Sequence, residues 1–306
     1  MRDATAGDPI TGLKWTHKSL RAVARELTRT GYPISAPTVG RLLAARHYAL
    51  RVNRKKLAGK QVSGRDEQFR YLAQWRATFL QQQRPVISVD TKKKELIGCF
   101  KQAGQQWRRT PHEVLDHDFR SDALGLAIPY GIYDIGRNQG YLVIGTTHDT
   151  PQFAVAAIRR WWHEVGRLAY PEKHDLLIQA DGGGSNGSRC RAWKTSLQEL
   201  ADECGLTITV THYPPGTSKW NPIEHRCFNL ISGNWAGEPL VSYETALKHI
   251  CATKSSTGFR CKARLDEKFY ATGIKISPKE MAALLIEKHE LFPQWNYTIY
   301  PRGNPG

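Results

Sequence analysis

The sequence has no long apolar run and no clustered cysteines. No stretch approaches the roughly 18 consecutive apolar residues of a membrane-spanning helix, so we expect a soluble chain without a membrane partner. Residues 1–11 include Arg2, Asp3 and Asp8 and lack the apolar core of a secretory signal, which indicates a cytoplasmic protein. The six cysteines occur singly, without a C-x-x-C pair or a zinc-finger spacing. They predict free thiols.

Acidic residues are scarce relative to basic ones. The 306 residues include 28 Asp and Glu against 44 Lys and Arg, a net charge of +16, while 40% hydrophobic content excludes a disordered polycation. The excess is uneven, because residues 1–84 contain 17 basic and 5 acidic residues and residues 85–306 contain 27 and 23. Since Lys and Arg neutralise phosphates, this asymmetry predicts a nucleic-acid-binding module joined to a more neutral domain. A merely soluble basic face is the alternative.

Two short helices are predicted near the N-terminus. Over residues 16–28 apolar side chains recur at the i, i+3, i+4 and i+7 spacing of one helical face, and Thr16 is a candidate cap. The Gly-Tyr-Pro run at 31–33 ends this helix. Ser35 then caps a second helix. The pattern is that of a helix-turn-helix, although an ordinary helical hairpin is the alternative.

The second helix of a helix-turn-helix enters the major groove of DNA. In that arrangement Thr38 and Arg41 face base edges and Arg46 lies near phosphates. We therefore expect an all-α DNA-binding module over residues 1–60, followed by a basic linker or helix over 61–84. The basic side chains from 51 onward are expected to lie along DNA, and a solvated charge run is the alternative.

Residues 85–306 change to an alternating α/β pattern. Val86 begins a short apolar, β-branched run that ends at Asp90, typical of a strand buried on both faces. Further strands are predicted at 132–135, 141–146, 174–180 and 206–212, with helices at 151–162 and 189–203, from Pro222, and at 242–252 and from 277. The order up to Pro222 is βββαβαβα, which requires a mixed sheet whose first three strands are antiparallel neighbours.

Three carboxylates lie at element ends within this order: Asp90, Asp181 and Glu224. The carboxyl ends of strands are where open α/β sheets form sites. Acidic groups gathered there repel one another unless a cation neutralises them, and an all-oxygen donor set suits Mg²⁺ or Mn²⁺. The sequence therefore predicts a divalent metal site.

Each carboxylate also has a structural alternative. The glycines that follow Asp181 have the G-x-G-x-x-G spacing of a dinucleotide site, but the acidic residue that should follow about 20 positions later at a strand end is missing. Glu224 is placed to complete a capping box with Asn221. Asp149 precedes Thr150-Pro151 and is interpreted as a helix cap, and Asp134 as a structural hairpin residue.

The residues around the three carboxylates extend the pattern. Ser88-Val89-Asp90-Thr91-Lys92-Lys93-Lys94-Glu95, Ala180-Asp181-Gly182-Gly183-Gly184-Ser185-Asn186-Gly187 and Pro214-Pro215 through Asn221-Pro222-Ile223-Glu224-His225-Arg226 resemble the DDE transposases of ISAzo-type insertion sequences. The last segment is also similar to the signature of the broader mariner-like superfamily. The resemblance runs from about Trp15 to Tyr300.

The resemblance implies a ribonuclease H-like fold and a catalytic triad of Asp90, Asp181 and Glu224. It further implies two Mg²⁺ (or Mn²⁺) ions held by that triad, and a bacterial, nucleoid-associated enzyme that binds element ends as double-stranded DNA, cleaves a strand and transfers it to target DNA. A homo-oligomer on DNA is expected, because two ends must be joined. DNA contacts are expected from side chains next to the triad, with a solvated turn as the alternative for the first three: Lys92, Lys93, Lys94, Lys219, His225 and Arg226.

Two other functions stay open. Members of this family usually have a longer N-terminal region than the 84 residues that precede the first catalytic strand, so a truncated, non-catalytic DNA-binding remnant is one alternative. A ribonuclease H-like nuclease that cuts DNA without joining it is the other.

Overall fold

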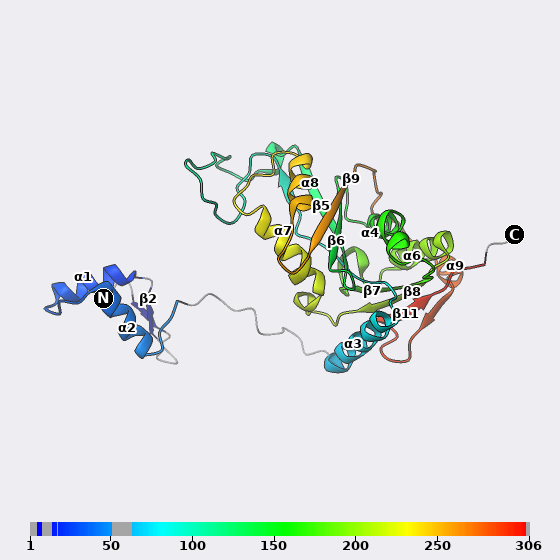
Figure 1. The fold of residues 1–306 in the computed structure, drawn as a ribbon, viewed down its shortest axis with the longest axis horizontal. Coiled ribbons are helices and arrows are strands. Elements are labelled where there is room, and N and C mark those ends of the chain that lie inside the picture. Colours follow the sequence, from blue (N-terminus) through cyan, green and yellow to red (C-terminus); the bar gives the residue numbers. More distant parts are fainter. Residues whose placement is uncertain (1–4, 8–13, 17, 51–62, 304–306) are drawn as a thin grey trace. The chain divides into compact units, whose positions relative to one another are not determined.

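The structure is a computed structural model that describes residues 5–7, 14–16, 18–50 and 63–303 (Figure 1). It divides into two compact units, Met1–Leu57 and Ala58–Gly306. The basic stretch at 51–60 that we expected along DNA falls outside the described residues. Among the helices that are described, none combines the length and the hydropathy needed to cross a membrane.

The first unit contains the two predicted helices, α1 (Leu20–Arg29) and α2 (Ala36–Ala45). They pack through a small core formed by Val23, Ala24 and Val39. The predicted helical module is thus present, but it also contains a two-stranded sheet, in which β2 (Lys14–Thr16) pairs antiparallel with β1 (Thr5–Gly7). The prediction of Thr16 as a cap is wrong, because Thr16 ends β2. Ser19 caps α1 instead, and Ser35 caps α2 as predicted, its side chain accepting a hydrogen bond from the Thr38 amide.

The second unit is built on a mixed sheet in the order β10-β11-β8-β7-β3-β5-β6-β9, with β4 paired to β5. The predicted antiparallel neighbours are confirmed, since β3 pairs with β5 and β5 with β6, and β7 and β8 run parallel to β3. This central order is the one that a ribonuclease H-like fold requires. The strands are β3 (Val86–Thr91), β4 (Glu95–Ile97), β5 (Gly125–Asp134), β6 (Gln139–Gly145), β7 (Asp175–Ala180), β8 (Thr207–His212), β9 (Arg260–Asp266), β10 (Ile286–Lys288) and β11 (Asn296–Ile299).

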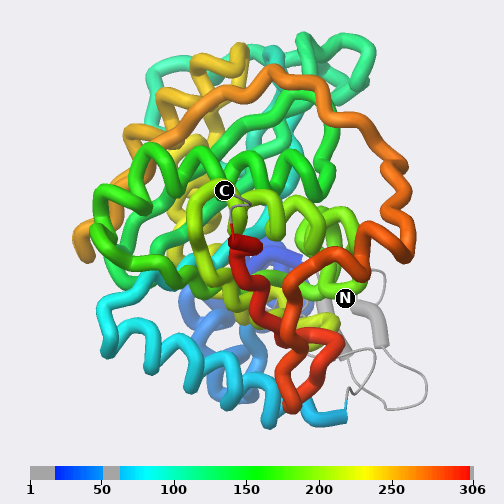
Figure 2. Tube along the Cα trace, turned by 90° about the vertical axis from the view of Figure 1, so that its right-hand side faces the viewer, coloured from blue at the N-terminus to red at the C-terminus, as the bar shows by residue number. Residues whose placement is uncertain are grey.

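The strands β4, β9, β10 and β11 were not predicted. β9 pairs parallel with β6 at one edge of the sheet, and its exposed positions Arg260 and Lys262 alternate with buried Cys261 and Ala263. Basic residues on a short segment hid this period-2 pattern, and charge on an edge strand discourages pairing with other chains. From β9 the chain runs along the outside of the unit before it returns as β10 and β11 (Figure 2).

Helices cover both faces of the sheet. On one face α4 (Pro151–Trp161) and α6 (Arg191–Cys204) bury Trp161 and Trp193 against alternate strand residues, such as Ile87 and Ile178. On the other face lie α3 (Arg65–Gln81), a π-helical turn at Glu224–Phe228 that continues into α7 (Asn229–Asn234), and α8 (Tyr243–Ala252). Farther along, the helix predicted from 277 is present as α9 (Pro278–Ala282), and Ser277 and Glu280 form a capping box at its start. All six cysteines are free, as predicted.

Candidate active site

Asp90 and Asp181 are neighbours because of the register of two parallel strands. The pairing of β3 with β7 aligns Val89 with Ala180, and the residue that follows each of them is an aspartate. Both lie at the carboxyl ends of their strands, where an open sheet presents ligands. The expected juxtaposition of these two carboxylates is therefore present, and β3 extends one residue farther than predicted, to Thr91.

Glu224 is held beside them by hydrogen bonds between its helix and β3. The Asn221 side chain donates to the Val89 carbonyl oxygen (3.1 Å) and accepts from the Ser88 hydroxyl. The same hydroxyl accepts from the Ile223 amide at 3.0 Å. The Asn221 side chain thus bonds β3 and also the Asp181 carboxylate rather than the Glu224 amide, and the capping-box alternative does not describe this turn. Glu224 instead opens a π-helical turn, a feature that recurs at functional sites.

Burial and mutual repulsion make the three carboxyl groups poor anions on their own. They raise the pKa of Asp90 to about 8, with Asp181, Glu224 and Asp149 as the neighbouring charges. Burial and Glu224 raise the pKa of Asp181 to about 6. Burial also raises the pKa of Glu224, although His225 and Lys92 oppose the shift. Groups perturbed by burial and by each other are typical of functional sites.

The donor set fits a hard divalent cation. Oδ1 of Asp181 is buried and has no hydrogen-bond partner among the described residues, which is the state expected of a ligand oxygen. The surrounding carboxylates supply only oxygen donors, which Mg²⁺ and Mn²⁺ prefer. Asp90, Asp181 and Glu224 are the residues that would hold such ions.

The glycine-rich turn after Asp181 is not the start of a dinucleotide-binding helix. A short 3₁₀ turn at Gly184–Asn186 follows, and α6 begins only at Arg191, without a side-chain cap. The buried His212 ring holds this turn in place, because its Nε2 lies 2.9 Å from the Asn186 carbonyl oxygen. Its Nδ1 lies 2.8 Å from the Trp295 carbonyl oxygen, and burial lowers the pKa of the ring to about 4. Sequence reasoning did not single out His212.

Asp149 was interpreted as a helix cap, and that interpretation is wrong. Thr150 caps α4, its side chain accepting from the Phe153 amide at 3.2 Å. Asp149 instead accepts a 3.1 Å hydrogen bond from the Thr91 hydroxyl and lies 3.6 Å from Lys94 Nζ. It lines the same cavity of about 410 Å³ as Asp90 and Asp181. A fourth carboxylate therefore lies at the site, and its Asp-Thr-Pro context concealed it. Asp134 is structural as predicted, accepting from the Tyr170 hydroxyl.

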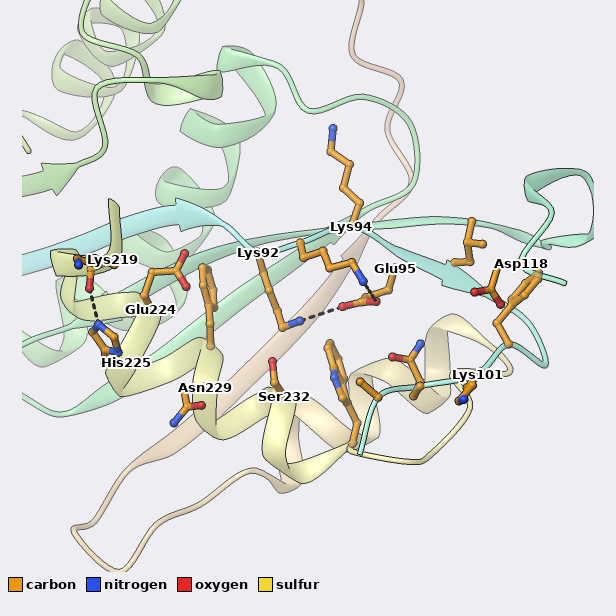
Figure 3. Close-up of a pocket in the computed structure, with 17 residues that line it drawn as sticks. Lys92, Lys94, Glu95, Lys101, Asp118, Lys219, Glu224, His225, Asn229 and Ser232 are labelled. Atoms are coloured by element: carbon orange, nitrogen blue, oxygen red, sulfur yellow. Dashed lines mark hydrogen bonds and ion pairs between the residues drawn. The ribbon is translucent and has the colours of Figure 1, made fainter. Parts of the chain in front are cut away.

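The basic residues beside the triad differ in their surroundings (Figure 3). Lys92 is 7% exposed, forms a 3.0 Å ion pair with Glu95 and lies 4.5 Å from the centre of the Trp235 ring. Lys93 and Lys94 are exposed at the turn that follows. The exposed side chains farther along are Lys219, whose ammonium lies over the Trp220 ring, His225, whose ring bonds the Lys219 carbonyl oxygen, and Arg226.

In the first unit the predicted DNA contacts lie on α2. Arg41 and Arg46 are exposed. Thr38 is half-buried, and its hydroxyl bonds the capping Ser35 hydroxyl (2.9 Å) and accepts from Arg41 (3.3 Å). These residues stay predicted contacts.

Comparison with known proteins gave one family and several solved structures. Solved structures that resemble the chain include a Mos1 transposase paired-end complex with left transposon end, 14% identical over 76% of this chain and 65% of that chain with a TM-score of 0.44. A Mos1 strand transfer complex is 12% identical over 76% and 64%, with a TM-score of 0.41. A Mos1 mariner paired-end complex with Mn is 15% identical over 76% and 65%, with a TM-score of 0.44. The chain thus spans just under two thirds of the Mos1 chains.

No curated protein matches the sequence. The profile of one family, described as Rhodopirellula transposase DDE domain, matches residues 1–301. That match covers nearly the whole chain, both units and all three carboxylates included. The chain belongs to this transposase DDE-domain family.

Proposed function

We propose that this protein is the transposase of a bacterial insertion sequence, which binds the ends of its element, cleaves a DNA strand and joins it to target DNA. The observation that carries the proposal is the convergence of Asp90, Asp181 and Glu224 at one edge of the sheet, with a buried, unpartnered oxygen on Asp181. Family membership supports the same activity.

In this proposal Asp90, Asp181 and Glu224 are the residues that would hold divalent cations. Two Mg²⁺ ions, when bound, would activate the attacking oxygen and stabilise the leaving oxygen of an in-line phosphoryl transfer. The chain's own part is orientation. Asn221 and Ser88 fix the helix of Glu224 on β3, and Thr91 fixes Asp149. Each would keep a carboxylate in place when the cations and DNA arrive.

Recognition of the element ends is assigned to the first unit. Thr38 and Arg41 are proposed to read bases and Arg46 to contact a phosphate, since α2 exposes both arginines. Near the triad, Lys93, Lys94, Lys219, His225 and Arg226 are proposed DNA contacts, whereas burial of Lys92 assigns it to the wall of the site. A homo-oligomer on DNA in the bacterial nucleoid completes the proposal.

The test is cleavage of a labelled duplex that carries the terminal repeat, with Mg²⁺ or with EDTA, beside an Asp181→Ala variant. We expect metal-dependent nicking at the repeat boundary, lost in the variant, followed by joined products. Nicking without joined products would indicate the nuclease alternative. Binding without cleavage in any divalent metal would contradict the catalytic proposal and leave a DNA-binding remnant.

A further inference from the structure

A second, larger cavity opens beside the carboxylates on the side of Glu224 (Figure 3). Its volume is about 960 Å³, and we call it the lysine groove. One wall is the segment Lys92–Ala103, and the other is the helix that begins at Pro222 and ends near Trp235. Lys92, Lys93 and Lys94 line both this groove and the smaller cavity with Asp90 and Asp181. The lysine turn is therefore a ridge between the two cavities.

The side chains that face the groove have the chemistry of a phosphate backbone site. Lys93 is 85% exposed, and Lys101 is exposed farther along the same wall. On the opposite wall His225, Asn229 and Ser232 are exposed and line the groove. Lys, Asn and Ser side chains are common donors to phosphate and sugar oxygens.

The acidic residues of the groove do not cancel this charge. Glu95 is paired with Lys92 at 3.0 Å, and this pair is buried against Trp235. Lys93 Nζ lies 4.0 Å from the other Glu95 oxygen, but the Lys93 side chain is 85% exposed and keeps donors free to face a phosphate. Glu224 belongs to the proposed metal site. Asp118 is the remaining carboxylate that lines the groove.

We infer that the lysine groove binds the phosphodiester backbone of the DNA strand that continues past the scissile phosphate, with Lys93, Lys101, Asn229 and Ser232 as its contacts. This inference rests on the proposed function, because it needs a scissile phosphate at the carboxylates. It adds Lys101, Asn229 and Ser232 to the residues that touch DNA. The strand crosses the lysine ridge at Glu224 and leaves along the helix.

The experiment measures equilibrium binding in an Asp181→Asn background, where the DNA stays uncut. Two probes carry the same terminal repeat, one ending at the cleavage position and one extended beyond it by five single-stranded nucleotides. A third probe replaces the phosphates of the extension by neutral methylphosphonates. Variants are Lys93→Ala/Lys101→Ala and Asn229→Ala/Ser232→Ala, and Lys262→Ala/Lys279→Ala is the control with equal charge loss at exposed positions elsewhere.

We expect the chain without groove substitutions to bind the extended probe more tightly than the other two. The lysine pair variant should remove that gain and lower the slope of log K against log salt by about 0.7 per lysine on the extended probe alone. The polar pair variant should reduce the gain severalfold, and the control should keep it. Equal binding of all three probes, or equal losses in the control and groove variants, would overturn the inference. Failure of the wild-type chain to cleave any repeat duplex in Mg²⁺ would instead overturn the proposed function.

Discussion

The two units of the chain are stabilised and charged in different ways. Among its described residues, the first buries the apolar side chains of Val23, Ala24 and Val39, and it lies in the strongly basic part of the sequence. The second has a large apolar cluster on each face of its sheet, and four carboxylates lie together where its central strands β3 and β7 end. A small core with exposed arginines suits binding, which needs surface charge. A rigid sheet suits chemistry, which needs fixed positions. Changes in one unit should therefore affect one of these properties and spare the other.

The largest effect is expected from Asp181→Asn. Losing one ligand charge should lower the rate of strand cleavage by at least about 10³-fold, because metal ions contribute several kcal/mol to such transition states. The dissociation constant for repeat DNA, which depends on the first unit, should stay within about twofold of the wild-type value. Asp175→Asn, at the other end of the same strand β7, is the matched control. Equal loss of cleavage in both variants would break the assignment.

Core substitutions should lower the stability of the unit in which they lie and leave the stability of the other unit unchanged. Trp193 is fully buried and donates a 3.0 Å hydrogen bond to the Tyr297 hydroxyl. Trp193→Ala should lower the free energy of unfolding of the second unit by about 3 to 5 kcal/mol. Val39→Ala removes about two methylene equivalents from the first unit and should cost about 1.6 kcal/mol in transfer free energy. Denaturation with a probe in each unit should show each change in its own transition, and a shared transition would contradict the comparison.

The hydrogen bonds behind Glu224 give a smaller effect. Asn221→Ala keeps all the carboxyl groups but releases the helix from β3 and removes a hydrogen bond to Asp181, so the rate at saturating DNA should fall about 10- to 100-fold, as for other residues that orient metal ligands. DNA affinity should change little. Single-turnover cleavage over a range of DNA concentrations separates the two quantities, and a loss of affinity with an unchanged rate would assign Asn221 to binding.

The acidic edge should also affect stability as pH rises. Without metal the pKa of Asp90 is raised from 3.8 to about 8, and that of Asp181 from 3.8 to about 6. Because the folded values lie above the unfolded ones, the folded chain retains these protons while the unfolded chain releases them. Their contribution to stability is thus present below about pH 4 and is lost as pH rises toward 8.

Mg²⁺ should restore part of that loss at pH 8, by about 2.7 kcal/mol at a 100-fold excess over its dissociation constant. Melting temperature across this pH range, with EDTA and with Mg²⁺, measures both effects. An Asp90→Asn/Asp181→Asn variant should show a flatter pH profile and little response to Mg²⁺. If wild type showed the same flat pH profile and the same weak response to Mg²⁺ as this variant, the pKa values of the two carboxyl groups would not be raised in the folded chain.

The smallest effect is expected from Arg46→Ala in the first unit. Removing one proposed phosphate contact should lower the salt dependence of binding by about 0.9 in the slope of log K against log salt, for all duplex sequences alike. Cleavage at saturating DNA should be unchanged. Titrations at several salt concentrations measure the slope, and an effect confined to one sequence would indicate base reading rather than a phosphate contact.

The sequence predicted those parts of the molecule whose signals are local. The apolar run at Val86 and the helical period before Ser35 are readable over a few residues, and β3 and α1 followed from them. β9 was missed, because alternating arginines and lysines on an edge strand resemble a solvated loop. The same holds for the site, where the residues with a local signal were predicted and those that depend on distant contacts were not.

The triad was expected from element ends and from family resemblance, whereas its supports depend on contacts between distant segments. Asn221 has the local sequence pattern of a helix cap. Only its hydrogen bond with Ser88, on a distant strand, shows that it holds the helix to β3 instead. A lone hydroxyl inside an apolar strand was the available signal. Asp149 likewise resembled a cap until the sheet brought it to Thr91. His212 gave no signal, since its partners lie on two separate loops.

The most direct measurement is the binding of Mn²⁺ to the full chain, followed by the electron paramagnetic resonance signal of the free ion at pH 8. We expect wild type and Asp175→Asn to remove Mn²⁺ from solution alike, Asp90→Asn and Asp181→Asn to do so far more weakly, and added Mg²⁺ to displace the bound ion. Equal Mn²⁺ binding by all four chains, or none by wild type in the presence of repeat DNA, would contradict the claim that these carboxylates form a divalent metal site.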